Sequence, residues 1–277
     1  MKLEFERHSS DALTWEMATR AAPPALRGLV RNYTGYVERS AEKLARREVP
    51  TGDVTLILSP ANELTLPDGR HSSFVAALHD SHTVVEHDGF QEGIEVRLTP
   101  LGTHALFGLP MHELTNRVVE LEDLIGRDAG ELLERIWDEP GWERRFAVVD
   151  AAIAARAARA TLPSSELSWA WGRMRASAGR ASVGGLANEL GWSHRRLIAR
   201  FRESIGLPPK TLGRVLRFER VSALLRQIEE PRLAEVAFDC GYYDQAHLNR
   251  DFRQFAGTTP SAYLARRLPP GGGVEAG

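Results

Sequence analysis

Two copies of one residue pattern lie about fifty residues apart near the C-terminal end of the chain. The first copy contains Leu186-Ala187, Gly191-Trp192, Leu197, Phe201-Arg202, Gly206 and Pro209. The second contains Val236-Ala237, Gly241-Tyr242, Leu248, Phe252-Arg253, Gly257 and Pro260. The offset is 50 residues before the turn and 51 after it. Such self-similarity marks a duplicated supersecondary unit, so both copies must fold in the same way.

Each copy is predicted to be a helix, a turn and a second helix. Ser182 is suited to cap the leading helix of the first copy, Gly191 to end it in the left-handed conformation, and Ser193 to cap the next helix. In the second copy, Gly241 and Asp244 take the places of the terminating glycine and the second cap. This arrangement presents one helix of each copy to a DNA major groove.

The helices that follow the two turns have an apolar and a polar face. Leu197 and Phe201 in the first copy are four residues apart and share the inward face, as do Leu248 and Phe252 in the second. The outward faces are polar and basic, which suits contacts to phosphates and base edges. Together with Lys210, the residues expected to contact DNA are Arg195, Arg196, Ala199, Arg202, Gln245, Ala246, His247, Asn249, Arg250 and Arg253.

Between the copies, the stretch from Lys210 to Ile228 has apolar residues at helical spacing. A helix of that length would be roughly 28 Å long, and successive major-groove faces of B-DNA are about 34 Å apart. One chain can therefore place its two reading helices in two adjacent major-groove segments of double-stranded DNA.

A resemblance to a known family rests on five segments. LANELGWS, FRESIGLPPK, RFER, VAFDCGYYDQAHLNRDFR and FAGTTPSAYL, in that order and spacing, resemble the DNA-binding domain of the AraC family of bacterial transcription regulators. The resemblance covers residues 165–268 and implies a tandem helix-turn-helix domain. The first reading helix departs from the family pattern, because Ile198 and Ala199 stand where the family often carries a polar base reader. In the first reading helix, bases would therefore be contacted by Arg195, by Arg196 or through apolar contact with a thymine methyl group.

Charge is divided unevenly along the chain. The whole chain has a net charge of −2, but residues 161–268 contain 17 Lys and Arg against 10 Asp and Glu, a net +7 that leaves −9 for the remainder. The basic charge therefore lies with the repeat, as DNA binding requires. No apolar run approaches the ~20 residues that span a bilayer, and the first ten residues lack the apolar core of a signal peptide. A cytoplasmic protein is expected.

The N-terminal part has the pattern of a small antiparallel β domain, with short apolar segments separated by turn residues. The expected strands are Val54–Ser59, Glu63–Leu66, Phe74–Leu78, Thr83–Glu86 and Gly93–Thr99. The segments NYTGYVERS, REVPTGDVTLIL and RLTPLGTHALFGLPMHEL resemble the sensor half of one AraC subgroup. In such proteins this domain is often a cupin-like barrel that binds a small effector.

From Met111 to Arg159 the pattern turns helical, with apolar residues every three or four positions. This segment is suited to couple the domains, to form a homodimer face or to pack on its own β domain, and we favour the last. Thr161 to Ser165 is the expected linker. The sequence thus predicts an α+β protein with a β-rich effector-binding domain at 1–110, a helical segment at 111–160, a tandem helix-turn-helix domain at 165–268 and a disordered tail at 269–277.

The residues do not favour an enzyme. His79, His82 and His87 form the one cluster whose residue types suit a metal, but on a strand His79 and His82 would face opposite sides. His112-Glu113 begins a zinc-protease pattern that fails at Asn116, which replaces the second histidine. No nucleophile elbow, phosphate loop or dinucleotide fingerprint is present. We expect no catalytic residue, metal or cofactor.

The single cysteine, Cys240, excludes an internal disulfide and a cysteine-cluster zinc site. It occupies an apolar helix position directly before Gly241, which is typical of a buried structural thiol rather than a reactive sensor. An alkyl-transfer enzyme with this type of DNA-binding domain would need several cysteines.

The sequence therefore indicates a sequence-specific DNA-binding transcription regulator controlled by a small effector. Its expected partners are double-stranded DNA, a small-molecule effector, and RNA polymerase if it activates transcription. Effector binding would shift the population of a conformation that docks both reading helices. Two alternatives remain open. One is a metal-dependent cupin-like enzyme fused to a DNA-binding module, and the other is a DNA-packaging protein without sequence preference.

Overall fold

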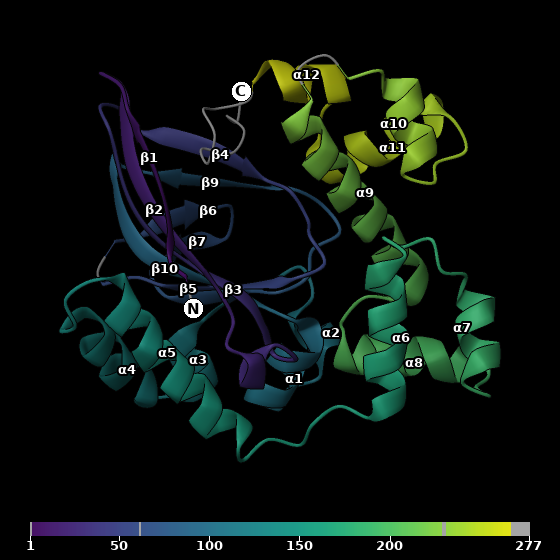
Figure 1. The fold of residues 1–277 in the computed structure, drawn as a ribbon, viewed down its shortest axis with the longest axis horizontal. Coiled ribbons are helices and arrows are strands. Elements are labelled where there is room, and N and C mark those ends of the chain that lie inside the picture. Colours follow the sequence, from purple (N-terminus) through teal and green to yellow (C-terminus); the bar gives the residue numbers. More distant parts are fainter. Residues whose placement is uncertain (1, 61, 229–230, 267–277) are drawn as a thin grey trace.

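The computed structural model describes residues 2–60, 62–228 and 231–266. A β-rich part with attached helices forms one side of the molecule and a helical part forms the other, with the long helix α9, Pro209–Gln227, along the boundary (Figure 1). The predicted α+β architecture with a β-rich N-terminal part and a helical C-terminal part is confirmed. The expected disordered tail at 269–277 lies outside the described residues.

Within the described residues, the strands of the N-terminal part form two antiparallel sheets. The larger sheet has the order β1-β2-β3-β10-β5-β8-β11, and the smaller has the order β4-β9-β6-β7. The strands are β1 (Glu4–Ser9), β2 (Leu13–Ala21), β3 (Val30–Ser40), β4 (Leu44–Glu48), β5 (Val54–Leu58), β6 (Leu64–Leu66), β7 (Gly69–His71), β8 (Phe74–Ala76), β9 (Thr83–His87), β10 (Phe90–Leu98) and β11 (Val118–Glu120).

The larger sheet uses its two faces differently, because side chains alternate along each strand. On β10, Val96 and Leu98 are fully buried in the core that also contains Phe146 of a covering helix. Glu95 and Arg97 belong to the opposite face and line a cavity enclosed together with the smaller sheet. The β-rich part is therefore layered as helices, larger sheet, cavity and smaller sheet.

The helices of the N-terminal part are α1 (Pro100–Phe107), α2 (Met111–Leu114), α3 (Leu121–Ile125), α4 (Asp128–Trp137) and α5 (Trp142–Ala157), and a 3-10 turn, Pro24–Leu26, precedes β3. Helix α5 packs on the larger sheet, since a Cβ atom at Gly35 of β3 would lie 2.2 Å from the Trp142 ring. The rings of Tyr33 and Phe146 lie 5.6 Å apart. This is the packing on the β domain that the sequence favoured.

Residues 118–120 differ from the predicted helical segment at 111–160. They form β11, in which Val119 pairs with Val75 of β8 at the edge of the larger sheet. A three-residue strand is too short to disturb the three- and four-residue spacing of apolar positions, so the pattern wrongly assigns Val118 to a helix. The sheet therefore extends beyond residue 110.

The helical part contains α6 (Ser165–Ala176), α7 (Val183–Glu189), α8 (His194–Ser204), α9, α10 (Leu233–Asp239), α11 (Gln245–Ala256) and α12 (Pro260–Ala265). The side chains of Ser182, Ser193 and Asp244 cap α7, α8 and α11 by accepting a backbone N–H three residues later. Gly191 and Gly241 follow α7 and α10 with φ angles of 64° and 80°. The predicted caps and turns are confirmed in both copies.

The spacer helix α9 agrees with its predicted bounds to within one residue at each end. On α9, the ring of Phe218 lies 4.9 Å from that of Phe252 and 5.3 Å from that of Phe255, both on α11. All three rings are fully buried. Aromatic packing thus fixes the second unit on the spacer.

The β-rich part contacts both helix-turn-helix units at the same position of the repeat. Gly206 and Gly257, which follow α8 and α11, are equivalent residues and have φ angles of 101° and 64°. A Cβ atom at Gly206 would lie 2.6 Å from Thr115 Oγ1, and one at Gly257 would lie 2.3 Å from His82 Cε1. The end of each reading helix is therefore packed directly on the N-terminal part.

Polar contacts reinforce this docking. Arg47 of β4 donates from Nη1 to the carbonyl oxygen of Ala256 at the end of α11, at 2.8 Å. Arg175 of α6 binds Glu219 of α9 at 2.9 Å and lies 3.6 Å from Asp53, which lines the cavity. Charged groups therefore connect the cavity-bearing part to α6, α9 and α11.

Candidate nucleic-acid interface

The first reading helix, α8, presents its expected DNA-contacting residues to solvent. Arg195, Arg196, Ala199 and Arg202 are all exposed, and the Arg196 guanidinium lies 4.6 Å from the centre of the Trp192 ring. Leu197 and Phe201 are fully buried on the opposite face. The inward and outward faces of α8 are therefore as predicted.

The second reading helix, α11, shows the same division with two intermediate positions. Gln245, Ala246, Arg250 and Arg253 are exposed. His247 and Asn249 are half-buried. The His247 ring packs edge-on against Tyr242, with ring centroids 5.1 Å apart, and Asn249 Oδ1 is buried. These two side chains offer less surface to a ligand than their neighbours on α11.

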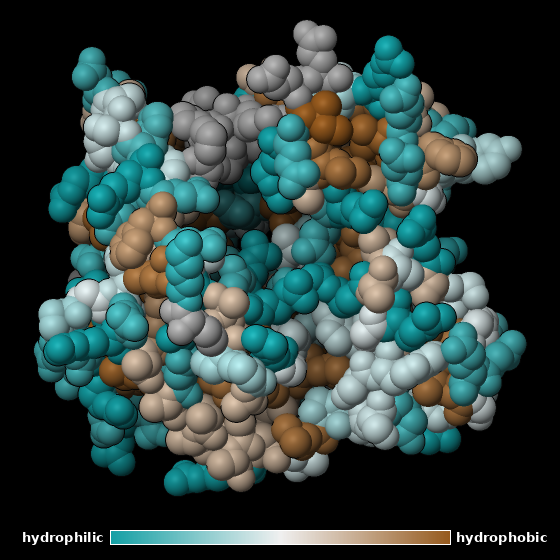
Figure 2. Space-filling model, viewed as in Figure 1, coloured by the Kyte–Doolittle hydropathy of each residue, from teal (hydrophilic) through white to brown (hydrophobic). Residues whose placement is uncertain are grey.

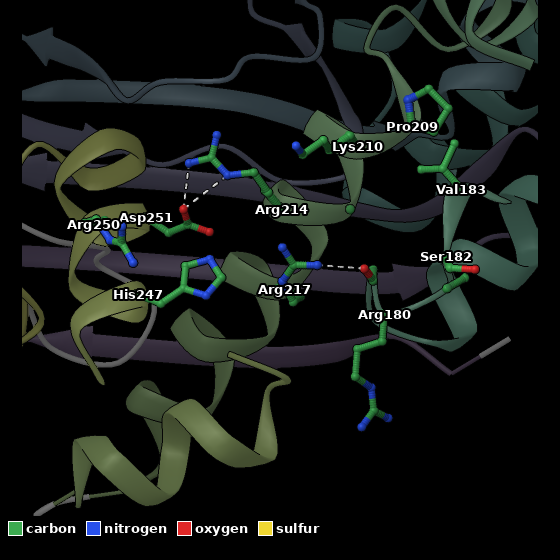
Figure 3. A pocket seen from close by; sticks show the side chains of 13 residues that line it. Arg180, Ser182, Val183, Pro209, Lys210, Arg214, Arg217, His247, Arg250 and Asp251 are labelled. Carbon is green, nitrogen blue, oxygen red and sulfur yellow. Dashed lines mark hydrogen bonds and ion pairs between the residues drawn. The ribbon is translucent and has the colours of Figure 1, made fainter. Parts of the chain in front are cut away.

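A basic hollow lies between the two units. It has a volume of about 690 Å³ and joins the loop before α7, the first half of α9 and the outer face of α11 (Figure 3). Its charged or titratable lining residues are Arg180, Lys210, Arg214, Arg217, His247, Arg250 and Asp251. Lys210, His247 and Arg250 are thus brought together, whereas the predicted residues of α8 lie outside the hollow.

Hydrogen bonds position the arginines of α9 in this hollow. Arg214 binds the buried Asp251 through Nη2 at 2.6 Å, and Arg217 donates from Nη1 to the carbonyl oxygen of Gly179 at 2.9 Å (Figure 3). Lys210 and Arg250 are exposed and form no hydrogen bond or ion pair with any described residue. Among the described lining residues, one carboxylate faces five cationic side chains, so the hollow is suited to attract phosphate.

Sequence reasoning missed Arg180, Arg214 and Arg217. A signal was present for α9, because Lys210, Arg214 and Arg217 follow one another at four and three residues and so share one face of a helix. The apolar residues of the same helix led only to the prediction that it is a packed spacer. Arg180 joins the group only through the tertiary fold.

The molecular surface is mixed in polarity. On the face drawn in Figure 2, hydrophobic residues gather beside the C-terminal helices at the top and over the lower centre, and hydrophilic residues cover much of the remainder. The exposed large hydrophobic side chains of the described residues include Ile198 on the first reading helix, and Phe238 and Tyr243 in the second unit. Ile198 is on α8, Phe238 is on α10 and Tyr243 lies in the turn after α10, so the three do not form an apolar stripe on one helix.

The cavity between the two sheets is the second candidate site. It has a volume of about 410 Å³, and its lining combines charged groups of β3, β4 and β10 with apolar groups of β5, β6 and β8. Glu38 and His87 lie in its wall, with Glu38 Oε1 2.9 Å from His87 Nε2, and both side chains are buried. A neighbouring Arg46 also binds Glu38. Hydrogen bonding to His87 and Arg46 outweighs the effect of burial and lowers the pKa of Glu38.

The three histidines considered as metal ligands have separate surroundings. His79 Nδ1 lies 2.7 Å from the carbonyl oxygen of Ala77, His82 packs at Gly257, and His87 faces Glu38. In the described part of the chain, no group of three His, Cys, Asp or Glu side chains is placed to hold a metal ion. The alternative of a metal-dependent enzyme therefore gains no support from their geometry.

Cys240 is a buried free thiol, as predicted. Burial raises the pKa of Cys240, which keeps the thiol protonated and unreactive. No helix in the described ranges has the length and apolarity needed to cross a membrane.

Comparisons with known proteins identify two domains. Residues 186–266 match a family model described as a helix-turn-helix domain, and residues 18–120 match a model described as a domain of unknown function, DUF6597. A comparison with curated proteins found no match.

Several solved structures are similar to this chain. ToxT from Vibrio cholerae is 11% identical, with 92% of this chain and 98% of that chain covered and a TM-score of 0.46. ToxT with a bound unsaturated fatty acid is 12% identical, with coverage of 94% and 97% and a TM-score of 0.44. A transcriptional regulator with an AraC-type DNA-binding domain from Chromobacterium violaceum is 27% identical, with coverage of 38% and 95% and a TM-score of 0.35.

Proposed function

Because the C-terminal part of this chain is an AraC-type helix-turn-helix domain, we propose that the protein is a sequence-specific transcription regulator whose DNA affinity is set by a small effector in the β-rich part. Regulators of this type are non-enzymatic, and no catalytic role is assigned. The regulator would act in the cytoplasm on double-stranded DNA, and would contact RNA polymerase if it activates transcription.

The basic hollow between the two units is the observation that carries the proposal. When α8 and α11 enter successive major-groove segments, the sugar-phosphate backbone between those segments passes in front of α9. Lys210 and Arg250 have no protein partner in the described residues, so their charge is available to phosphates. Arg214 and Arg217 are held in place by hydrogen bonds and add fixed positive charge.

Strand β4 supplies a route from the cavity to the second reading helix. Arg46 and Glu48 line the cavity, while Arg47 between them binds the end of α11 at Ala256. Side chains of a strand alternate between its faces, so a ligand that displaces Arg46 or Glu48 also moves Arg47. The ligand would thereby favour one of two domain arrangements, as a population shift requires.

A second route runs through Asp53, which lines the cavity and binds Arg31 at 3.1 Å. Arg175 lies 3.6 Å from Asp53 and also binds Glu219 of α9. Burial outweighs the two arginines and raises the pKa of Asp53. The backbone N–H of Gly52 donates to the same Glu219 at 3.2 Å. Movement at the cavity rim therefore reaches the spacer helix directly.

Salt dependence of DNA binding tests the proposal. We expect the logarithm of the affinity for a specific duplex, measured by fluorescence anisotropy, to fall with the logarithm of salt concentration with a slope of about −4 to −6. Lys210→Ala should make that slope less steep by about one unit. Arg144→Ala removes the same charge from an exposed position of α5 and should leave the slope unchanged.

A slope near zero, or equal effects of Lys210→Ala and Arg144→Ala, would contradict the proposed interface. A duplex of scrambled sequence serves as the second control. Equal affinity for the specific and the scrambled duplex would favour the packaging alternative, because sequence-specific proteins bind their sites roughly 10³-fold or more tighter than other DNA.

A further inference from the structure

The cavity between the two sheets has a polar and an apolar half. Its volume of about 410 Å³ lies within the ~300–1,000 Å³ range of small-ligand sites. The apolar half is formed by Ile57, Leu64, Leu66, Phe74, Val85 and Val118. The polar half includes Glu38, Arg46, Glu48, Gln91, Glu95 and Arg97.

This division follows from the strand order. In the larger sheet, β5, β8 and β11 are neighbours at one edge and carry apolar side chains into the cavity, whereas β3 and β10 beside them carry polar ones. In the smaller sheet, β6 is apolar and the edge strand β4 is charged. A ligand that fills the cavity must therefore be amphipathic.

The two arginines of the polar half each have a carboxylate partner, although Arg46 Nε has no hydrogen-bond partner within the described residues. Arg97 binds Glu95 at 2.8 Å, and Arg46 binds Glu38. Both arginines are thereby neutralised by a carboxylate that lines the same cavity. An anionic ligand head that accepted from Arg46 Nε would lie close to the carboxylate of Glu38, whose negative charge opposes it.

Glu48 is the carboxylate left over. It lines the cavity, and its side chain forms no hydrogen bond or ion pair with any described residue. By surface area the Glu48 side chain is exposed, at the rim of the cavity. The packing around its carboxyl group and the neighbouring Glu95 raise its pKa, against the charges of Arg46, Arg97 and Arg226, which lower it. A cation placed beside Glu48 would offset both effects.

Gln91 is an independent sign that a ligand belongs here. Its side chain is 8% exposed and lines the same cavity. Within the described residues its Nε2 atom has no hydrogen-bond partner. An unsatisfied buried donor is costly and is uncommon unless a bound molecule satisfies it.

We propose that the cavity binds an amphipathic cation whose protonated nitrogen pairs with Glu48 and whose hydrocarbon body fills the apolar half. This inference rests on the effector role proposed above and names the chemical class of the effector. Gln91 donates to a hydrogen-bond acceptor of the same ligand. Amphipathic amines that also carry a hydroxyl or carbonyl oxygen meet both requirements. Simple alkylamines supply the charge and the hydrocarbon body without the acceptor for Gln91, and fatty acids do not belong to the class.

Three probes of one length test the charge preference on the unmodified full-length protein. n-Octylamine, which is protonated at neutral pH, octanoate and octanol are titrated into the protein in a calorimeter. We expect one octylammonium per chain, bound roughly tenfold to a hundredfold tighter than octanoate, as a charge-assisted hydrogen bond implies. Octanoate binding as tightly as the amine, binding of none of the probes, or several amines per chain would each overturn the proposal.

Glu48→Gln should weaken octylammonium binding about tenfold or more and leave octanol binding within about twofold. Glu42→Gln removes the same charge from an exposed residue outside the cavity and should change neither. Unaltered amine affinity in Glu48→Gln would overturn the role of Glu48. The comparison of the three probes requires no variant, so it decides the charge preference even if Glu48→Gln does not fold.

DNA titrations of the same samples separate this inference from the proposed function. If the protein binds DNA selectively and in a salt-dependent way but does not bind the amine, the ligand-class inference is wrong and the proposed function still stands. Amine binding without selective DNA binding would sink the proposed regulator and leave the ligand class standing.

Discussion

Replacement of Gly257 by alanine should uncouple the second reading helix from the β-rich part, and Gly191→Ala is its matched control. Both glycines have a φ angle of 64°, so a Cβ atom costs each of them roughly 1–2 kcal/mol of backbone strain. The surroundings differ. A Cβ atom at Gly191 meets nothing within 4 Å, whereas at Gly257 it would lie 2.3 Å from His82 Cε1 and 2.6 Å from Arg47 Nη1.

That Arg47 atom is also the donor to Ala256 O. A new methyl group therefore expels the guanidinium from its hydrogen bond, and a bond from a charged donor contributes about 1.5–3 kcal/mol. We expect Gly191→Ala to lower the free energy of unfolding by roughly 1–2 kcal/mol and Gly257→Ala to lower it by roughly 2.5–5 kcal/mol, the sum of strain and lost bond.

Urea unfolding of the full-length protein measures both values, and a double-mutant cycle with Arg47→Met isolates the contact. In the Arg47→Met background, Gly257→Ala should cost about 1.5–3 kcal/mol less than in the wild type, since the bond is already absent. Equal costs of the two glycine substitutions, or a coupling energy near zero, would refute the reasoning that Gly257 is a docking point.

Four further outcomes are expected. Arg250→Ala and Gln245→Ala should each relax preference at particular bases by about 1–3 kcal/mol, whereas Arg202→Ala should weaken all sequences alike; selection from a randomised duplex library distinguishes the two patterns. Because the folded-state pKa of Glu48 is raised, its favourable contribution exists below the ordinary carboxyl pKa of ~4.3 and is lost as pH rises through the raised value. Because the Glu48 side chain is exposed and solvent screens its charge, Glu48→Gln should raise the melting temperature only slightly at neutral pH, with no difference from wild type in acid; an effect of opposite sign would show that Glu48 is stabilised as a carboxylate. A fragment of residues 164–268 should fold alone and keep the sequence preference of the whole chain. An effector that alters DNA binding by the intact protein should leave this fragment unaffected; a persisting response would move the effector site into the helical part.

The helical part was predictable because its signals are local. Ser182, Ser193 and Asp244 are caps whose effect is confined to the next three residues, and Gly191 and Gly241 are needed for a left-handed turn. The duplication provided an internal check, since each assignment in one copy had to hold in the other. Such features need no knowledge of distant contacts.

The β-rich part was only partly predictable. The five expected strands correspond to β5, β6, β8, β9 and β10, which contain recognisable apolar segments. Strands β1 and β3 gave no such signal, because β1 is almost wholly exposed and β3 carries Gly35 against Trp142 and Glu38 into the cavity. A strand that lines a polar cavity on one face and packs a glycine on the other has no clean alternation of polar and apolar residues.

The candidate sites show the same limit. The exposed arginines of α8 and α11 could be found from helical periodicity, whereas Arg180 enters the basic hollow only through the tertiary fold. His82 was considered as a metal ligand, but it packs against Gly257, which is 175 residues away in the sequence. Contacts over such separations leave no periodic trace in a single sequence.

The contact between the helical part and the β-rich part is duplicated on one side only: the two helix-turn-helix units are copies of each other, but the surfaces that they contact are not. Gly206 and Gly257 are descendants of one position, yet the first meets Thr115 after α2 and the second meets His82 before β9. These partner surfaces share neither sequence nor secondary structure, so each can change without altering the other. Mutation can therefore adjust the contact of one helix-turn-helix unit at a time, and the two units can evolve different degrees of attachment to the β-rich part.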